Sequence, residues 1–304
     1  MASQELKEIK ALMLEGRRQV SGQRTLGVEE LRAAFADTMA GLPAVEGMRH
    51  DSVDAGGVPA EWTYPEGDSD VNGTLLYLHG GGYFEGSPVT HRRLVASLCL
   101  AAGIRGLAVD YRLAPEHPFP AAVDDALAAY KWLIGPAGED ASQVIVAGDS
   151  AGGGLAAALL VALRDSGSPL PAGAYLVSPW TDLAGTGDSM RTRVDADPMI
   201  DPSHLAEVAT WYAPEGEWRN PLVSPQYADL AGLPPLLVHV GDAEVLLDDA
   251  TRLAERARLS GVAVDCEVWP DAFHVFQALA GILPEADEAV AQSGAWMTKR
   301  LLAG

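Results

Sequence analysis

One serine lies in a pattern that could make it a nucleophile. Ser150 is the centre of Gly148-Asp149-Ser150-Ala151-Gly152, between an apolar run at 144–147 and a helix-like stretch from 153 onward. A strand, a sharp turn and a helix form the context in which a G-x-S-x-G serine becomes exposed on a strained backbone. The pattern alone arises by chance in about 0.2 chains of this composition, so its context carries the argument. The stretch does not end in the Gly-Lys-Ser/Thr of a phosphate-binding loop. It also lacks the G-x-G-x-x-G spacing of a dinucleotide-binding site.

A glycine-rich loop follows another apolar run. His79-Gly80-Gly81-Gly82 comes directly after residues 74–78. Attack on an ester carbonyl creates an oxyanion, and backbone N–H groups of a loop without side chains can approach that charge to about 2.7–3.1 Å. We interpret the loop as part of an oxyanion hole, and we predict that the His79 ring braces it.

A nucleophilic serine needs a base, and the base needs an acid that orients it. Among seven histidines, His274 is the best candidate base, because it lies in a loop after a strand-like run and downstream of the serine. His239 lies inside an apolar run and is expected in the core. The others are expected at the surface or in loops: His50, His91, His117 and His204. No histidine spacing is typical of a metal site, so we expect no metal.

The acid should follow the apolar run at 236–240. Asp242 and Glu244 both fit this position, and the residues alone do not choose between them. Asp248 and Asp249 are expected in or at the start of the next helix.

The elements that must position these residues alternate along the chain. The expected strands are residues 74–78, 104–109, 144–147, 174–177, 236–240 and 262–269, and the expected helices are 92–102, 121–133, 153–164 and 245–259. Alternation of this kind predicts an α/β fold with a parallel sheet that is covered by helices on both faces.

Two segments depart from the alternation. Residues 5–42 carry apolar side chains at helical spacing and predict one or two helices with a break near Ser21-Gly22. Residues 181–227 are rich in Pro, Asp and Trp and lack a strand pattern, which is typical of a functional lid. A separate small domain is the alternative for this segment. We predict a catalytic core with an inserted cap, in three parts: cap helices at 1–45, a core at 46–180 and 228–304, and a cap insertion at 181–227.

Composition excludes several classes of protein. The 304 residues include 21 Lys and Arg against 42 Asp and Glu, a net charge of −21. Nucleic acids and anionic membranes are therefore not expected partners. The two cysteines, Cys99 and Cys266, are too few for a disulfide framework. Since no segment reads as a signal peptide or a membrane span, we expect a cytoplasmic protein.

The motifs together resemble the bacterial hormone-sensitive-lipase-like (family IV) esterases of the α/β-hydrolase fold. The resemblance rests on HGGG, GDSAGG at 148–153, YRLAPE at 111–116 and PFPA at 118–121, and it extends from about residue 45 to the C-terminus. It implies a mostly parallel eight-stranded sheet with a helical cap. It also implies Ser150 as nucleophile, His274 as base, and an oxyanion hole formed by the N–H groups of Gly81, Gly82 and Ala151.

The resemblance also selects an acid. The family's D-P-L-x-D pattern, laid on Glu244-Val245-Leu246-Leu247-Asp248, makes Glu244 the acid, with Glu in place of Asp and Val in place of Pro. Asp242 is the less favoured alternative. The resemblance implies that a Ser-His-Glu triad hydrolyses carboxylic esters with short acyl groups through an acyl-enzyme, without a cofactor. The alternatives are a lactone hydrolase with the same triad and a non-catalytic receptor for a small ligand.

Two further predictions concern the substrate and the assembly. Tyr83, Trp211 and Phe276 are candidate pocket residues, with ordinary packing as the alternative. The run from Val262 to Trp269 would be the last strand of the sheet, and its open edge could pair in a homodimer.

Overall fold

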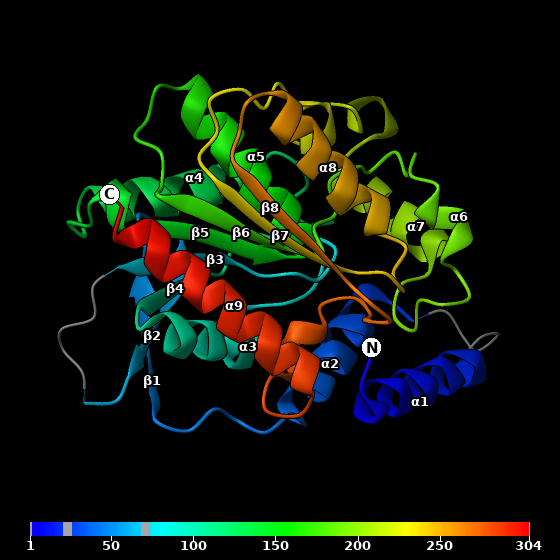
Figure 1. Ribbon diagram of the computed structural model, residues 1–304. Helices are drawn as coiled ribbons and strands as arrows, with labels where there is room; N and C mark the ends of the chain where they lie inside the picture. Colours follow the sequence, from blue (N-terminus) through cyan, green and yellow to red (C-terminus); the bar gives the residue numbers. More distant parts are fainter. Residues whose placement is uncertain (1, 21–25, 68–72, 304) are drawn as a thin grey trace.

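One eight-stranded sheet runs through the protein (Figure 1). The computed structural model describes residues 2–20, 26–67 and 73–303. The strand order is β1-β2-β4-β3-β5-β6-β7-β8. The strands are β1 (Met48–Asp54), β2 (Pro59–Pro65), β3 (Thr74–Leu78), β4 (Arg105–Val109), β5 (Val144–Asp149), β6 (Gly173–Val177), β7 (Leu236–Gly241) and β8 (Val264–Trp269). The strands from β3 to β8 pair in parallel, whereas β1 and β2 are antiparallel.

The six predicted parallel strands are confirmed, and two strands were not assigned from the residues. In β3, β5, β6 and β7 every residue is buried, which explains their unbroken apolar runs. In contrast, β1 is a polar edge strand with a single buried residue, Met48. An exposed edge strand has no apolar pattern by which its sequence could be distinguished from a loop.

Helices cover both faces of the sheet (Figure 1). One apolar cluster contains side chains of α4 (Ala121–Ile134), α5 (Ala151–Asp165) and α8 (Leu247–Leu259). The other contains side chains of α3 (Pro88–Ala102) and α9 (Pro284–Leu301). A helix was predicted at 92–102, whereas α9 was not predicted from the sequence. The helix α3 begins four residues earlier than expected, because Ser87 caps it by accepting a hydrogen bond from the Thr90 N–H.

The two segments expected to form a cap lie against each other. The chain begins with α1 (Gln4–Val20) and α2 (Val28–Ala40), and the predicted break near Ser21-Gly22 lies outside the described residues. The segment 181–227 is more regular than expected, since it contains α6 (Ser189–Thr192) and α7 (Pro202–Tyr212). Figure 1 shows α1, α6 and α7 at the end of the molecule toward which the parallel strands point. Four single-turn 3₁₀ helices complete the described elements: η1 (Ala141–Gln143), η2 (Glu215–Glu217), η3 (Pro225–Tyr227) and η4 (Phe276–Leu279).

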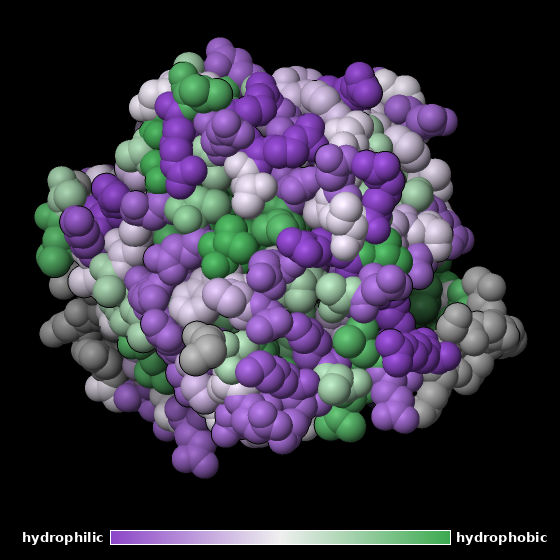
Figure 2. Space-filling model, turned by 45° about the vertical axis from the view of Figure 1, so that its right-hand side comes forward, coloured by the Kyte–Doolittle hydropathy of each residue, from purple (hydrophilic) through white to green (hydrophobic). Residues whose placement is uncertain are grey.

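The surface is dominated by polar side chains. Figure 2 shows hydrophilic residues spread over one face, with small apolar patches between them. In the described part of the chain, no helix has both the length and the apolar character needed to cross a bilayer.

Candidate active site

Ser150 occupies a sharp turn between β5 and α5. Its φ of 53° and ψ of −122° place the backbone in a left-handed region that is costly for any residue except glycine. The Ser150 N–H donates to the Val177 carbonyl at 2.8 Å, which ties the turn to β6. A Cβ atom on Gly152 would lie 2.1 Å from the Leu78 carbonyl oxygen. The second glycine of the motif is therefore required by the close approach of α5 to the end of β3.

His274 and Glu244 form a direct pair. His274 Nδ1 lies 2.8 Å from Glu244 Oε2. Glu244 is fully buried, and its other oxygen, Oε1, accepts hydrogen bonds from Ser178 Oγ at 2.8 Å and from the Gly241 N–H at 2.6 Å. Asp242, the alternative acid, accepts a hydrogen bond from the Asp271 N–H at 2.7 Å instead. The structure thus brings Glu244 to the imidazole and leaves Asp242 outside.

The charges around His274 favour its protonated form. Burial by itself would lower the pKa of His274. The hydrogen bond to Glu244 and the negative charges of Glu244, Asp197 and Asp149 outweigh it, so the pKa of His274 is raised above 6.5. A base with a raised pKa accepts a proton from a hydroxyl more readily than free imidazole does.

Ser178 links the loops that carry the base and the serine. Its Oγ, which donates to Glu244, also accepts a hydrogen bond from the Val275 N–H at 3.2 Å. The neighbouring Val177 carbonyl holds the Ser150 N–H. Within the described ranges, neither Ser150 Oγ nor His274 Nε2 has a hydrogen-bond partner. With Nδ1 engaged by Glu244, Nε2 is the nitrogen that remains for a substrate or a nucleophile.

The glycine-rich loop offers free backbone donors. Gly81 and Gly82 have φ values of 112° and 57°, which side chains would disfavour. Among the residues that the structure describes, the N–H groups of Gly81 and Gly82 donate to no acceptor. Ala151 is the first residue of α5, where an N–H has no partner within the helix. These three groups are available to an anion.

The bracing role predicted for His79 is confirmed. The His79 ring is stacked on Tyr111, with ring centroids 4.2 Å apart, and its Nδ1 lies 2.8 Å from the Gly80 carbonyl oxygen. The Tyr111 hydroxyl donates to the His79 carbonyl at 2.7 Å. Burial lowers the pKa of His79 to about 3, so the ring is neutral.

The prediction for His91 was wrong. His91 is buried on α3, with Nε2 3.4 Å from Asp149 Oδ2. Burial opposes a charge on the ring, but Asp149 and the Ser87 carbonyl raise the pKa of His91 above its ordinary value. The signal was present in the sequence, since His91 precedes Leu94, Val95 and Leu98 at helical spacing on the apolar face. Two more of these histidines lie in regular elements, His50 on β1 and His204 on α7, while His117 lies in a loop.

The three candidate pocket residues have different surroundings. Tyr83 is buried and stacked on Tyr212, with ring centroids 3.7 Å apart. Trp211 of α7 is partly exposed and contacts Phe84 edge to face. Phe276 is fully buried in the cluster beneath α9, with its ring 5.4 Å from that of Trp269. The structure therefore places Phe276 in the core.

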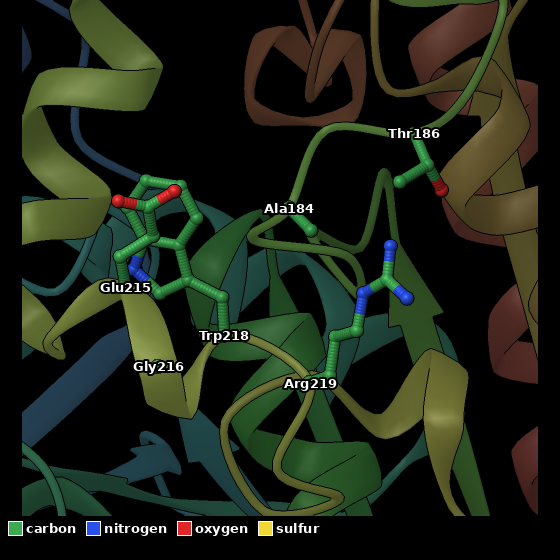
Figure 3. Close-up of a pocket in the computed structure, with 6 residues that line it drawn as sticks. All are labelled: Ala184, Thr186, Glu215, Gly216, Trp218 and Arg219. Carbon is green, nitrogen blue, oxygen red and sulfur yellow. The ribbon is translucent and has the colours of Figure 1, made fainter.

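Two cavities in the described part of the chain lie away from the predicted site residues. The smaller, of about 300 Å³, is drawn in Figure 3, where the Arg219 side chain extends toward Thr186 while Glu215 and Trp218 lie together on the other side. The larger, of about 610 Å³, lies between α1 and the segment 194–204. None of the predicted site residues lines either cavity.

Comparison with known proteins identifies the family. The α/β-hydrolase fold family matches residues 75–278. An acetyl-hydrolase of Streptomyces hygroscopicus is 43% identical over 98% of this chain and 97% of its own length. Carboxylesterase NlhH of Mycobacterium tuberculosis is 33% identical over 80% of this chain and 79% of its own length.

Solved structures agree with these relatives. An esterase from the bacterial hormone-sensitive lipase family superposes with a TM-score of 0.92, at 43% identity over 99% of both chains. EstE5 superposes with a TM-score of 0.93, at 40% identity over 99% of this chain and 100% of its own. The chain therefore belongs to the α/β-hydrolase fold family and, within it, to the hormone-sensitive-lipase-like carboxylesterases, which hydrolyse carboxylic esters.

Proposed function

We propose that the protein hydrolyses short-acyl carboxylic esters through a triad of Ser150, His274 and Glu244. The contact of 2.8 Å between His274 Nδ1 and Glu244 Oε2 is the observation that carries the proposal. It fixes the imidazole in the tautomer whose Nε2 accepts a proton. The strained turn at Ser150 supports the assignment, because a positive φ at a non-glycine residue costs free energy and such residues cluster at active sites.

The reaction has two similar halves. Ser150 Oγ attacks the ester carbonyl while His274 Nε2 takes the hydroxyl proton, and Glu244 stabilises the resulting imidazolium. The N–H groups of Gly81, Gly82 and Ala151 stabilise the oxyanion. His274 then protonates the departing alcohol, which leaves an acyl-enzyme. Water repeats the sequence on the acyl-enzyme and releases the carboxylic acid and free Ser150.

The proposed preference for short acyl groups rests on the limited space above the glycine-rich loop at 79–82. The helix α7 crosses this loop, with Val208 Cγ1 3.1 Å from the position that a Cβ on Gly82 would occupy. In this proposal the segment 181–227 and the N-terminal helices act together as the cap that narrows the site. A relative named acetyl-hydrolase and the soaking of EstE5 with p-nitrophenyl butyrate are in keeping with small acyl groups.

A series of p-nitrophenyl esters from acetate to palmitate, with Ser150→Ala as control, tests the proposal. Rates that peak between acetate and hexanoate and vanish in the variant would support it. A peak at long chains would overturn the acyl preference. A much higher rate on a seven-membered lactone would move the function to lactone hydrolysis by the same residues.

We also propose that β8 pairs in a homodimer. This strand is the last in the sheet order, and Val268 on it is 44% exposed. An open edge offers unpaired backbone donors and acceptors to a second copy. Size-exclusion chromatography with light scattering checks this, and a monomer at micromolar concentration would exclude it.

A further inference from the structure

Asp197 is a buried acid that the proposed mechanism leaves unused. It lies in the segment 181–227, and its side chain is inaccessible to solvent. Its Oδ2 accepts a hydrogen bond from the Val245 N–H at 2.8 Å, and its Oδ1 accepts from the N–H groups of Met199 and Ile200 at 2.8 and 2.9 Å. Val245 directly follows Glu244, so Asp197 holds the peptide unit next to the proposed catalytic acid.

The backbone around Asp197 is also held by a side chain of α1. Arg17 Nη1 donates to the carbonyl oxygens of Val194 and Asp197 at 2.9 and 2.5 Å. Its Nη2 donates to Asp201 at 3.1 Å. A continuous series of contacts thus runs from the N-terminal helix through the backbone and carboxylate of Asp197 to the loop that carries Glu244.

The Asp197 carboxylate is also part of the charge environment of the base. Three acidic groups act on His274 from three different elements: Glu244 after β7, Asp149 at the end of β5, and Asp197 from the inserted segment. In the described ranges the Asp197 carboxylate forms no ion pair, and its three hydrogen bonds come from backbone amides. The nearest basic group named here, the Arg17 guanidinium, binds the Asp197 backbone carbonyl and not its carboxylate. The charge of the carboxylate is one of those that raise the pKa of His274.

We propose that Asp197 is a positioning residue for ester hydrolysis, which fixes the peptide unit after Glu244 and stabilises the imidazolium of His274 as a second buried negative charge. The inference rests on the proposed triad, since it requires His274 to become charged in each half of the reaction. It makes the inserted segment a part of the catalytic apparatus as well as a cover for the site.

The variant Asp197→Asn tests both parts of this role. Asparagine keeps one acceptor oxygen but turns an NH₂ group toward one of the backbone donors, and it removes the charge. We expect the titration midpoint of His274, followed by NMR in the resting protein and assigned with His274→Gln, to move to lower pH. We also expect kcat/KM to fall about 3- to 10-fold through kcat, the range that corresponds to the net value of one buried hydrogen bond.

Asp201→Asn is the matched control. Asp201 belongs to the same segment and also binds Arg17, but its other contacts are with Ser203 at the start of α7. We expect this variant to leave the His274 midpoint unchanged. A purely structural role of Asp197 would lower activity without moving the midpoint, so an unchanged midpoint in folded Asp197→Asn overturns the proposal.

A second variant covers the case in which Asp197→Asn does not fold. Asp197→Ser is smaller, is neutral and keeps an acceptor for a backbone N–H, and the same midpoint criterion applies to it. Because the titration needs no turnover, its outcome is separate from the test of the triad. Retained hydrolysis in Ser150→Ala would overturn the proposed function whether or not Asp197 moves the midpoint.

Discussion

The carboxylate of Asp149 accepts a hydrogen bond from the backbone N–H of Gly80 at 2.9 Å. This contact joins the residue before the proposed nucleophile to the loop that carries the proposed oxyanion donors. The same oxygen accepts a hydrogen bond of 2.6 Å from the Tyr77 hydroxyl, and the second oxygen faces His91. The two glycine-rich motifs are therefore parts of one buried network.

Asp149→Asn should weaken this network. The substitution leaves the buried ring of His91 without its counter-charge, and breaking a buried charge pair from one side costs about 3–5 kcal/mol. We expect the free energy of unfolding in urea to fall by about that amount. Asp165→Asn, which affects an exposed ion pair at the end of α5, is the control and should change stability by less than about 1 kcal/mol. Equal losses in both variants would contradict the network.

Ser150→Ala should abolish ester hydrolysis without unfolding the protein. We expect kcat to fall by about 10⁴-fold or more, because the other groups cannot replace the nucleophile. The rate on p-nitrophenyl acetate measures the loss of hydrolysis, and the circular dichroism spectrum shows whether the variant is folded. Ser166→Ala, at the exposed end of α5, should keep full activity.

The pH dependence of activity should follow His274. The base must be neutral to accept the Ser150 proton, and its pKa is raised above 6.5, in net effect by the hydrogen bond to Glu244 and the surrounding acids. Activity should therefore fall as the pH is lowered through a midpoint above 6.5. A profile of kcat/KM against pH measures this midpoint, and a midpoint below 6.5 would contradict the expected charge environment.

Glu244→Gln should move that midpoint to lower pH, because the variant removes the negative charge closest to His274. It should also reduce kcat by roughly 10⁴-fold, since an amide can hold the imidazole in the wrong tautomer. Asp242→Asn serves as control, as Asp242 accepts its hydrogen bond from Asp271. Greater loss of activity in Asp242→Asn than in Glu244→Gln would assign the acid to Asp242.

Gly152→Ala should destabilise the protein through overpacking. The new methyl group would lie 2.1 Å from the Leu78 carbonyl oxygen and 2.3 Å from that of His79, both in backbone. We expect a loss of about 3 kcal/mol or more in urea unfolding. Gly16 on α1 has no atom within 4 Å of such a position, so Gly16→Ala should instead stabilise by about 0.5–1 kcal/mol.

The elements that could be predicted from the sequence are those that a short run of neighbouring residues specifies. The buried parallel strands and the turn at Ser150 follow from apolar runs and glycine positions. The edge strand β1 did not, since its side chains are mostly polar and exposed. The choice between Asp242 and Glu244 also could not be made from the residues, because two positions in one short loop differ only in the direction of their side chains.

Asp197 gave no signal in the sequence at all. Its contacts join the segment 181–227 to Val245, and nothing in either stretch indicates that they meet. Such a relationship depends on how an irregular segment packs, and single-sequence patterns report on regular elements only. The residues that the sequence did not predict are therefore those that hold the proposed triad in place.

The backbone strain at Ser150 sets activity against stability at a single residue. A non-glycine residue held in such a region costs of order 1–3 kcal/mol. Ser150→Gly should therefore be inactive and yet melt at a higher temperature than Ser150→Ala, which keeps the strain. A chain with no need to cleave esters would be more stable with glycine at this position. The positive φ of Ser150 is thus a loss of stability that accompanies the nucleophilic role proposed for it.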